Sequence, residues 1–238
     1  MTDETATFPP LMAGHAVSGG ATDPFEVAAQ KAMLGCDAGL VVYNAGTDWL
    51  RAALVFAPEV PLADAMAMLP LCAVGFQNAL GALAPPEVAV HLEWSGGLRI
   101  NGAACGRLRA MAASTDPAVI PDWLIVGFEL PLWPGTDNGG DTPDQTALYA
   151  EGCADVAPIP LLESWARHTL NWINRWDSEG TEPLHADWRG LAHDMGETVT
   201  QGDLTGTFLG VDERFGMLLR DASDTTHLIP LSSILETP

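Results

Sequence analysis

The sequence predicts an α+β protein, in which a mixed, mainly antiparallel sheet with helices on one face is followed by a small all-β module. Three observations predict this class. Apolar runs typical of strands recur through residues 39–130, helical apolar periodicity follows over 160–191, and alternating segments broken by turns fill 198–235. With 238 residues, 47% of them hydrophobic, the chain is long enough to bury a large core and a second, smaller one.

The first half of the chain predicts one short helix, one long helix and several strands. Pro24 follows Asp23 at a position suited to the first turn of a helix, and Gly35 ends the apolar pattern. The long helix is nearly all apolar and carries Pro70, which predicts a kink there because proline removes a backbone hydrogen bond. The expected elements are helix 24–34, strands 39–43 and 52–56, helix 62–83 and strand 88–94.

Two turn signals predict a meander over residues 88–113. Ser95-Gly96-Gly97 is a tight-turn sequence, and Asn101-Gly102 is the dipeptide that most favours a two-residue hairpin. Residues 123–130 form a near-continuous apolar run, as expected for a strand covered on both faces. The Pro, Gly, Asp and Asn residues of 131–144 then predict a surface loop.

The second half predicts two helices and a β module. A tryptophan-rich apolar stripe at three- and four-residue steps, opened by Pro160, predicts an amphipathic helix, and a shorter helix is expected over 184–191 after Gly180. The stripe consists of Leu162, Trp165, Ala166, Thr169, Trp172, Ile173 and Trp176. Residues 205–221 read as a hairpin that turns near 212–214. We therefore expect two domains, 1–191 and 192–238.

Charge and composition exclude several classes of function. A formal net charge of −21 with only ten basic residues disfavours binding to nucleic acid and to anionic membranes. The chain has no long apolar span and no basic signal-peptide start, so we expect a cytoplasmic protein. The four cysteines lie far apart and are expected to be buried, and the histidines share no metal-ligand spacing, so no metal site is predicted. These residues are Cys36, Cys72, Cys105, Cys153, His15, His91, His168, His185, His193 and His227.

Two segments resemble the biotin/lipoate protein ligase family. Residues 91–108 are similar to its active-site strand pair, where a Lys-Trp-Pro-Asn-Asp-Leu end leads to a Lys-Leu-x-Gly-Ile-Leu strand. Residues 161–192 and 206–230 look like the helical end of a bacterial biotin protein ligase joined to its SH3-like barrel. The spacing of Gly210, Val211, Asp212, Gly216, Leu218 and Leu219 matches the barrel hairpin. The resemblance implies a ligase-like domain followed by an SH3-like barrel, without the winged helix of repressor-type ligases.

The residues that the resemblance links to chemistry are replaced. Ala103 stands at the family's lysine, Gly96 and Gly97 at its Asn-Asp pair, and residues 44–51 at its Gly- and Arg-rich loop, with Arg51 the one arginine left. The family forms an acyl-adenylate, which needs cations near the developing negative charge. Its later asparagine is also missing, because residues 127–131 read Gly-Phe-Glu-Leu-Pro.

Six residues remain as ligand-binding candidates. They are Arg51, Trp94, Gly96, Gly97, Gly106 and Arg107. Each has a structural alternative: Trp94 as a core residue, Gly96 and Gly97 as turn residues, Gly106 as a bulge, and the arginines as ordinary surface charges. If the ligand is a carboxylate, Arg51 and Arg107 are expected to hold it on the exposed face of the hairpin, next to Trp94.

Three functions remain open at this point. The first is a divergent homologue that keeps a site for a small carboxylate such as biotin or lipoate but lacks the standard adenylation residues. It either binds a ligand or partner without catalysis and without ATP, or acts on a different substrate. The second is an active ligase that uses Arg51 and Arg107 for acyl-adenylation and transfer to a protein lysine. The third is an interaction module. A carrier-protein domain is a conceivable partner, and the oligomeric state, a dimer among the choices, is open.

Overall fold

The computed structural model describes residues 5–19, 22–135 and 144–236. Its main body is a seven-stranded mixed sheet in the order β1-β2-β3-β7-β6-β5-β4. Only β1 and β2 pair in parallel, and all other neighbours are antiparallel. The strands are β1 (Ala13–Ala16), β2 (Leu40–Ala45), β3 (Trp49–Phe56), β4 (Val90–Leu92), β5 (Gly97–Ile100), β6 (Ala103–Ala112) and β7 (Leu124–Pro131).

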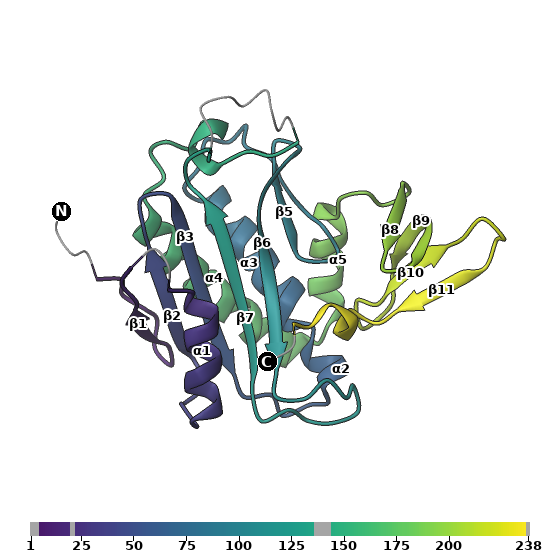
Figure 1. The fold of residues 1–238 in the computed structure, drawn as a ribbon, viewed down its shortest axis with the longest axis horizontal. Helices are drawn as coiled ribbons and strands as arrows, with labels where there is room; N and C mark the ends of the chain where they lie inside the picture. The colour runs from purple at the N-terminus through teal and green to yellow at the C-terminus, as the bar shows by residue number, and fades with distance from the viewer. Residues whose placement is uncertain (1–4, 20–21, 136–143, 237–238) are drawn as a thin grey trace.

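Helices cover both faces of this sheet, but unequally (Figure 1). Most of them lie on one face, together with the larger core. The single helix α1 (Pro24–Met33) packs on the other face over β2, β3 and β7, where Phe25 and Ala53 belong to a smaller core. The larger layer consists of α2 (Leu62–Ala65), α3 (Met68–Gly81), α4 (Pro158–Glu179) and α5 (Glu182–Leu191), with a short 3₁₀ turn at Leu148–Glu151.

The central strand β7 alternates between these two cores. Val126 and Phe128 face the larger core, and Ile125 faces α1. Because both faces are covered, its sequence is almost continuously apolar, as the run over 123–130 predicted. On the α1 face of β7 the charged residue is Glu129, which is central to the candidate site.

A separate four-stranded antiparallel sheet follows α5, in the order β11-β10-β9-β8. It contains β8 (Thr198–Gln201), β9 (Leu204–Val211), β10 (Met217–Arg220) and β11 (Thr226–Ile229), followed by a 3₁₀ turn at Leu231–Ile234. Figure 1 shows it beside α5, away from α1. The predicted all-β module is confirmed as a separate sheet, and its closure into an SH3-like barrel stays a prediction.

A central part of the contact between the two sheets is made by α5 and Trp94. Phe215, in the β9–β10 turn, is fully buried and lies edge-on to Trp188 at a centroid distance of 6.0 Å and beside His185 at 5.4 Å. The indole Nε1 of Trp94 donates to the Phe215 carbonyl at 2.7 Å. The tryptophans of α4 face elsewhere, because Trp165 and Trp172 donate to Cys72 and Asn78 of α3.

The predicted α+β class is confirmed, with three differences in detail. A helix also covers the second face, as α1 shows. The helix expected over 62–83 is broken at residues 66–67 and not at Pro70, because Pro70 falls in the first turn of α3, where a proline ring fits. The strand β1 was not anticipated, because its four residues, Ala-Gly-His-Ala, show no alternation of apolar and polar side chains.

Other expectations concern the loop, the cysteines and the membrane. Most of the predicted loop 131–144 lies outside the described residues. Cys72, Cys105 and Cys153 are buried and Cys36 is half-buried, and burial raises the pKa of Cys105 to about 12. Among the helices that the structure describes, none is both long and apolar enough to cross a membrane.

Candidate functional site

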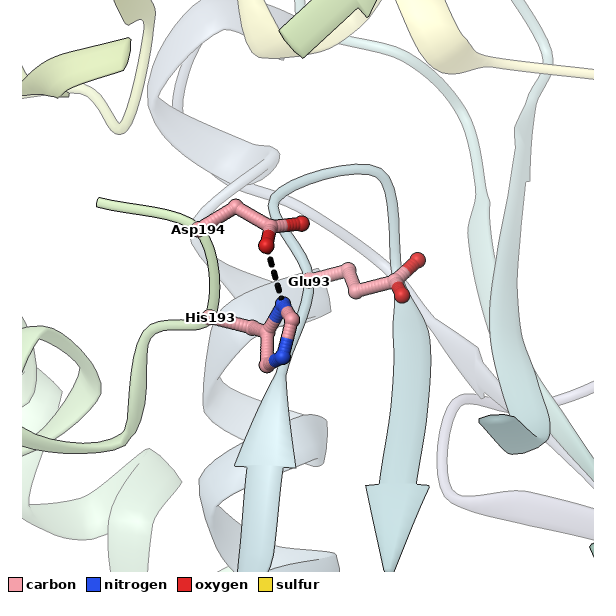
Figure 2. Close-up of side chains that lie close together, drawn as sticks. All are labelled: Glu93, His193 and Asp194. Carbon is pink, nitrogen blue, oxygen red and sulfur yellow. Dashed lines mark ion pairs between the residues drawn. The ribbon is translucent and has the colours of Figure 1, made fainter. Parts of the chain in front are cut away.

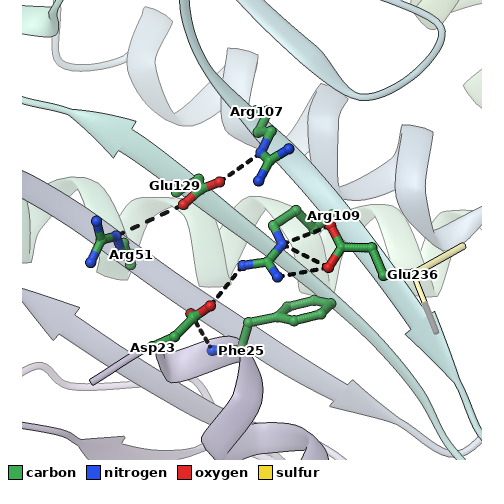
Figure 3. Close-up of polar contacts among 7 residues, drawn as sticks. All are labelled: Asp23, Phe25, Arg51, Arg107, Arg109, Glu129 and Glu236. Carbon is green, nitrogen blue, oxygen red and sulfur yellow. Dashed lines mark hydrogen bonds and ion pairs between the residues drawn. The ribbon is translucent and has the colours of Figure 1, made fainter. Parts of the chain in front are cut away.

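Three arginines lie on the α1 face of the sheet, around the carboxylate of Glu129 (Figure 3). Arg51 of β3 and Arg107 of β6 are the direct cross-strand neighbours of Glu129, because β7 runs between β3 and β6. The Nε atom of Arg107 donates to Glu129 Oε1 at 2.6 Å, and Arg51 Nε lies 3.9 Å from Oε2. The two predicted ligand-binding arginines therefore converge, but on a carboxylate of the protein itself.

Arg51 is less completely paired than Arg107. Its Nε atom is buried and has no hydrogen-bond partner among the described residues. The guanidinium group lies 4.9 Å from the ring centroid of Trp49, which is itself 39% exposed. A cation stacked on an exposed aromatic ring keeps donors available. Arg51 and the more exposed Arg107, of which only Nε is bonded to Glu129, are thus the arginines of this face that keep donors for an added anion.

Arg109 is held by two further carboxylates and one ring. Its guanidinium donates to Asp23, the N-cap residue of α1, at 2.7 Å and to Glu236 in a bidentate contact with a shortest distance of 2.6 Å. The group also lies 4.4 Å from the ring centroid of Phe25. The hydrogen bonds to Glu236 are the largest cause that raises the pKa of Arg109, and those to Asp23 add to it.

Glu236 reaches Arg109 because the end of the chain returns to the main sheet. The Glu236 backbone N–H donates to the Ala110 carbonyl at 2.9 Å, which makes a parallel bridge with Met111. The edge of β6 is free there, since β5 pairs only as far as Arg107. The face that holds Arg51 and Arg107 is therefore bordered by a segment from the far end of the sequence.

Trp94 lies away from these arginines, against our expectation of one shared surface. It is 5% exposed and belongs to the larger core, on the sheet face opposite α1. Its indole bonds the Phe215 carbonyl of the second sheet. The hairpin predicted by Asn101-Gly102 does form between β5 and β6, but it places Trp94 and Arg107 on opposite faces.

The candidate glycines have conformational roles. Gly96 turns the chain between β4 and β5 at φ +98°, where a side chain would collide with the Leu108 carbonyl. Gly106 has φ +92° and lies against the Glu129 backbone, inside a bulge of β6 opposite β5. Gly97 lies against the carboxylate of Glu93. Of the two roles considered for Gly106, ligand binding or a bulge, the backbone geometry of β6 supports the bulge.

Residues 44–51, which the resemblance places at a Gly- and Arg-rich loop, form a tight hairpin. Strand β2 ends at Ala45 and β3 begins at Trp49, so only three residues separate them, and the Gly46 N–H donates to the Trp49 carbonyl at 3.0 Å. Ala103 is the first residue of β6, directly opposite Ile100. An alanine there supplies no positive charge to the sheet surface.

Arg51 and Arg107 line none of three cavities in the described part of the chain. The first, of about 620 Å³, lies between α5 and the β9–β10 turn and includes His185 and Asp212. The second, of about 260 Å³, lies beside Cys36. The third, of about 330 Å³, lies at the seam between the two sheets.

The seam cavity brings together side chains that the sequence analysis did not connect. Glu93, His193 and Asp194 each offer a potential metal-ligand atom, and these atoms lie within 4.8 Å of one another (Figure 2). Glu93 follows β4, whereas the other two residues follow α5 a hundred positions later. The adjacent pair His193-Asp194 was the only local signal, and it is too common in sequences to indicate a site.

Comparisons with known proteins identify the fold and the family. A family model described as "Biotin/lipoate A/B protein ligase family" matches residues 8–190, and one described as "Domain of unknown function (DUF4444)" matches residues 195–237. Among curated proteins none matches the sequence.

Solved structures extend the likeness over nearly the whole chain. A biotin protein ligase-like protein of unknown function from Silicibacter sp. TM1040 is 70% identical, with 98% of this chain and 100% of that chain covered and a TM-score of 0.92. The apo biotin protein ligase from Aquifex aeolicus is 14% identical, with 94% and 96% covered and a TM-score of 0.72. The ligase from Leishmania major in complex with biotinyl-5-AMP is 16% identical, with 93% and 99% covered and a TM-score of 0.57. Taken with the family match over residues 8–190, these results show that the chain belongs to the biotin/lipoate A/B protein ligase family.

Proposed function

We propose that this protein is a non-catalytic member of its family that binds a small carboxylate, or a partner carrying one, on the α1 face of the sheet. The convergence of Arg51 and Arg107 on Glu129 carries this proposal. Two cations that share one internal carboxylate can instead share the carboxylate of a ligand, by charge-assisted hydrogen bonds of about 1.5–3 kcal/mol each. Biotin, lipoate and medium-chain fatty acids are the ligands that the family relationship suggests.

The proposed loss of catalysis rests on what surrounds these arginines. Acyl-adenylation requires free positive charge where the carboxylate and phosphates react. Here Glu129 neutralises Arg107, Asp23 and Glu236 neutralise Arg109, and Ala103 contributes no charge. Among the described residues, Arg51 Nε has no hydrogen-bond partner, and Arg107 makes one side-chain hydrogen bond, from Nε to Glu129. The charges of this face are therefore largely balanced within the protein, and the net charge of −21 of the whole chain disfavours the approach of ATP, which supports a role without adenylation.

The decisive experiment is pyrophosphate exchange with biotin, lipoate and octanoate, together with labelling of a biotin acceptor domain in the presence of ATP. We expect neither reaction. The variant Ala103→Lys should also remain inactive, because the groups of an adenylation site act as a unit and one lysine does not restore the others. Robust exchange or labelling by the wild-type chain would refute the proposal and favour a ligase that uses Arg51 and Arg107.

Binding is tested separately by calorimetry with the same three carboxylates. Arg51→Ala and Arg107→Ala should each weaken binding about 10-fold or more, the effect of losing one charge-assisted contact. Glu129→Gln should strengthen it, because the competing internal carboxylate loses its charge. Arg175→Ala is the matched control, since this arginine pairs with Glu179 on the surface of α4. Equal affinities across all four variants would remove the arginines from the binding role.

A further inference from the structure

We propose that Glu93, His193 and Asp194 form a divalent metal site at the seam between the main sheet and the second sheet. The three residues present one imidazole and two carboxylates whose ligand atoms lie within 4.8 Å of one another. Small side-chain movements suffice to bring such atoms onto one ion. The site is separate from the arginines of the α1 face, so it does not depend on the proposed carboxylate binding.

The local chain geometry fixes the two sides of the site before any ion binds. The His193 N–H donates to the Leu92 carbonyl at 2.8 Å, and Leu92 bridges Ala192 in parallel. The segment after α5 is therefore attached to the edge of β4 immediately next to Glu93. Figure 2 shows the Asp194 carboxylate facing the His193 ring, with Glu93 beside them and its carboxylate extended to the other side. Ligands held on anchored backbone lose little freedom when they bind an ion.

His193 and Asp194 present two ligand atoms side by side that one cation could bind. Asp194 Oδ1 lies 2.7 Å from His193 Nδ1, yet Nδ1 is buried and has no hydrogen bond of acceptable geometry among the described residues. A proton between these atoms is thus poorly aligned to join them. The neighbouring His91 also has a buried Nδ1 without a described partner, with its ring 6.1 Å from that of His193. Buried polar atoms are usually paired, so these unpaired nitrogens require an explanation.

Arg99 prepares Glu93 for this role. Its Nε donates to Glu93 Oε1 at 2.6 Å and its Nη1 to the Gly102 carbonyl at 2.9 Å, so one carboxylate oxygen is oriented and the other is left for a metal ion. Outer partners of this kind position metal-binding carboxylates. With Arg99 included, the cluster has two carboxylates and one fixed cation, and a divalent ion would compensate the remaining negative charge.

The donor set suggests the class of ion. One imidazole nitrogen with two carboxylate oxygens suits Zn²⁺, Co²⁺ or Mn²⁺, whereas Mg²⁺ prefers oxygen ligands alone. Three protein ligands leave at least one coordination position, which would open into the cavity of about 330 Å³ lined also by Thr198, Thr200 and Gln201. A water molecule or a small anion could occupy that position.

The test is calorimetric titration of the full chain with Zn²⁺, Co²⁺ and Mn²⁺ after treatment with a chelator, supported by the visible absorption of bound Co²⁺. A Cys36→Ser background removes the half-buried thiol, which would otherwise bind Zn²⁺. We expect one equivalent of at least one of these ions to bind. The variants His193→Ala and Glu93→Gln should each weaken that binding at least about 10-fold, the loss typical of removing even an outer partner.

The matched control is His227→Ala. His227 Nε2 and Asp221 Oδ2 also lie 2.7 Å apart, but this pair is not part of the three-residue cluster. Metal affinity should be unchanged in this variant. The proposal is overturned if none of the three ions binds the wild-type chain, or if His193→Ala and Glu93→Gln bind as tightly as His227→Ala while circular dichroism shows all of them folded.

Discussion

Replacing Trp94 by phenylalanine should weaken the junction between the two sheets. The indole of Trp94 is 5% exposed and donates to the Phe215 carbonyl at 2.7 Å. Phenylalanine keeps an aromatic ring but removes the donor, so a net hydrogen bond of about 0.5–1.5 kcal/mol is lost and a buried carbonyl is left unpaired at a cost of about 1–3 kcal/mol. These contributions overlap, and we expect the free energy of unfolding to fall by about 2 kcal/mol.

Urea unfolding followed by far-ultraviolet circular dichroism measures this change without relying on tryptophan fluorescence. The control is Trp176→Phe, because Trp176 is only partly buried and donates to the Thr181 hydroxyl over a longer distance of 3.3 Å. Its loss should cost less than about 1 kcal/mol. If Trp94→Phe is no more destabilising than Trp176→Phe, the hydrogen bond to Phe215 does not stabilise the junction and the reasoning is wrong.

Three further changes test other parts of the structure by the same measurement. Gly106→Ala should lower the free energy of unfolding by about 1–3 kcal/mol, because the left-handed backbone and the nearby Glu129 carbonyl both exclude a side chain. Gly102→Ala, at a position with open space around it, should lower the free energy of unfolding less. Equal losses in the two variants would contradict the steric argument. Arg109→Met should cost about 2 kcal/mol by removing charged hydrogen bonds to Asp23 and Glu236, and no loss would mean that these pairs are fully screened. The hydrogen bond with His227 is the largest cause that lowers the pKa of Asp221 to about 2. The Asp221 carboxylate should therefore stabilise the fold above about pH 4 and lose that contribution as the pH falls toward 2. The stability of Asp221→Asn should differ from that of the wild type at pH 7 and converge with it in acid, and a difference that stays constant with pH would refute the assignment.

The sequence predicted those parts of the fold that local chemistry determines. The Asn101-Gly102 turn and the hairpin near residue 212 form where expected, because their backbone conformations depend on the turn residues themselves. The break before α3 was misplaced because proline disfavours the middle of a helix but not its first turn. Which face α1 covers could not be predicted, since strands covered on both sides lose their alternation.

The candidate site was predicted only in part. Arg51 and Arg107 were expected to lie close together, and they do, but Glu129 between them was not considered because it read simply as part of an apolar strand. Trp94 was grouped with them, although a single bulge decides which face of a strand each side chain occupies. Glu93 and His193 are a hundred residues apart, so only the folded chain brings them together.

The attachment of Glu236 to β6 has a consequence for how the molecule unfolds. The second sheet is tied to the main sheet at its beginning, through α5, and again at its end, through the contact of Glu236 with Arg109 and Ala110. A segment fastened at both ends resists opening more than one hanging from a single linker, because separation must break both attachments together. The two sheets should therefore melt in one cooperative transition. A chain cut after residue 191 would lose more than its second sheet, because Arg109 would lose the bidentate partner that now neutralises it.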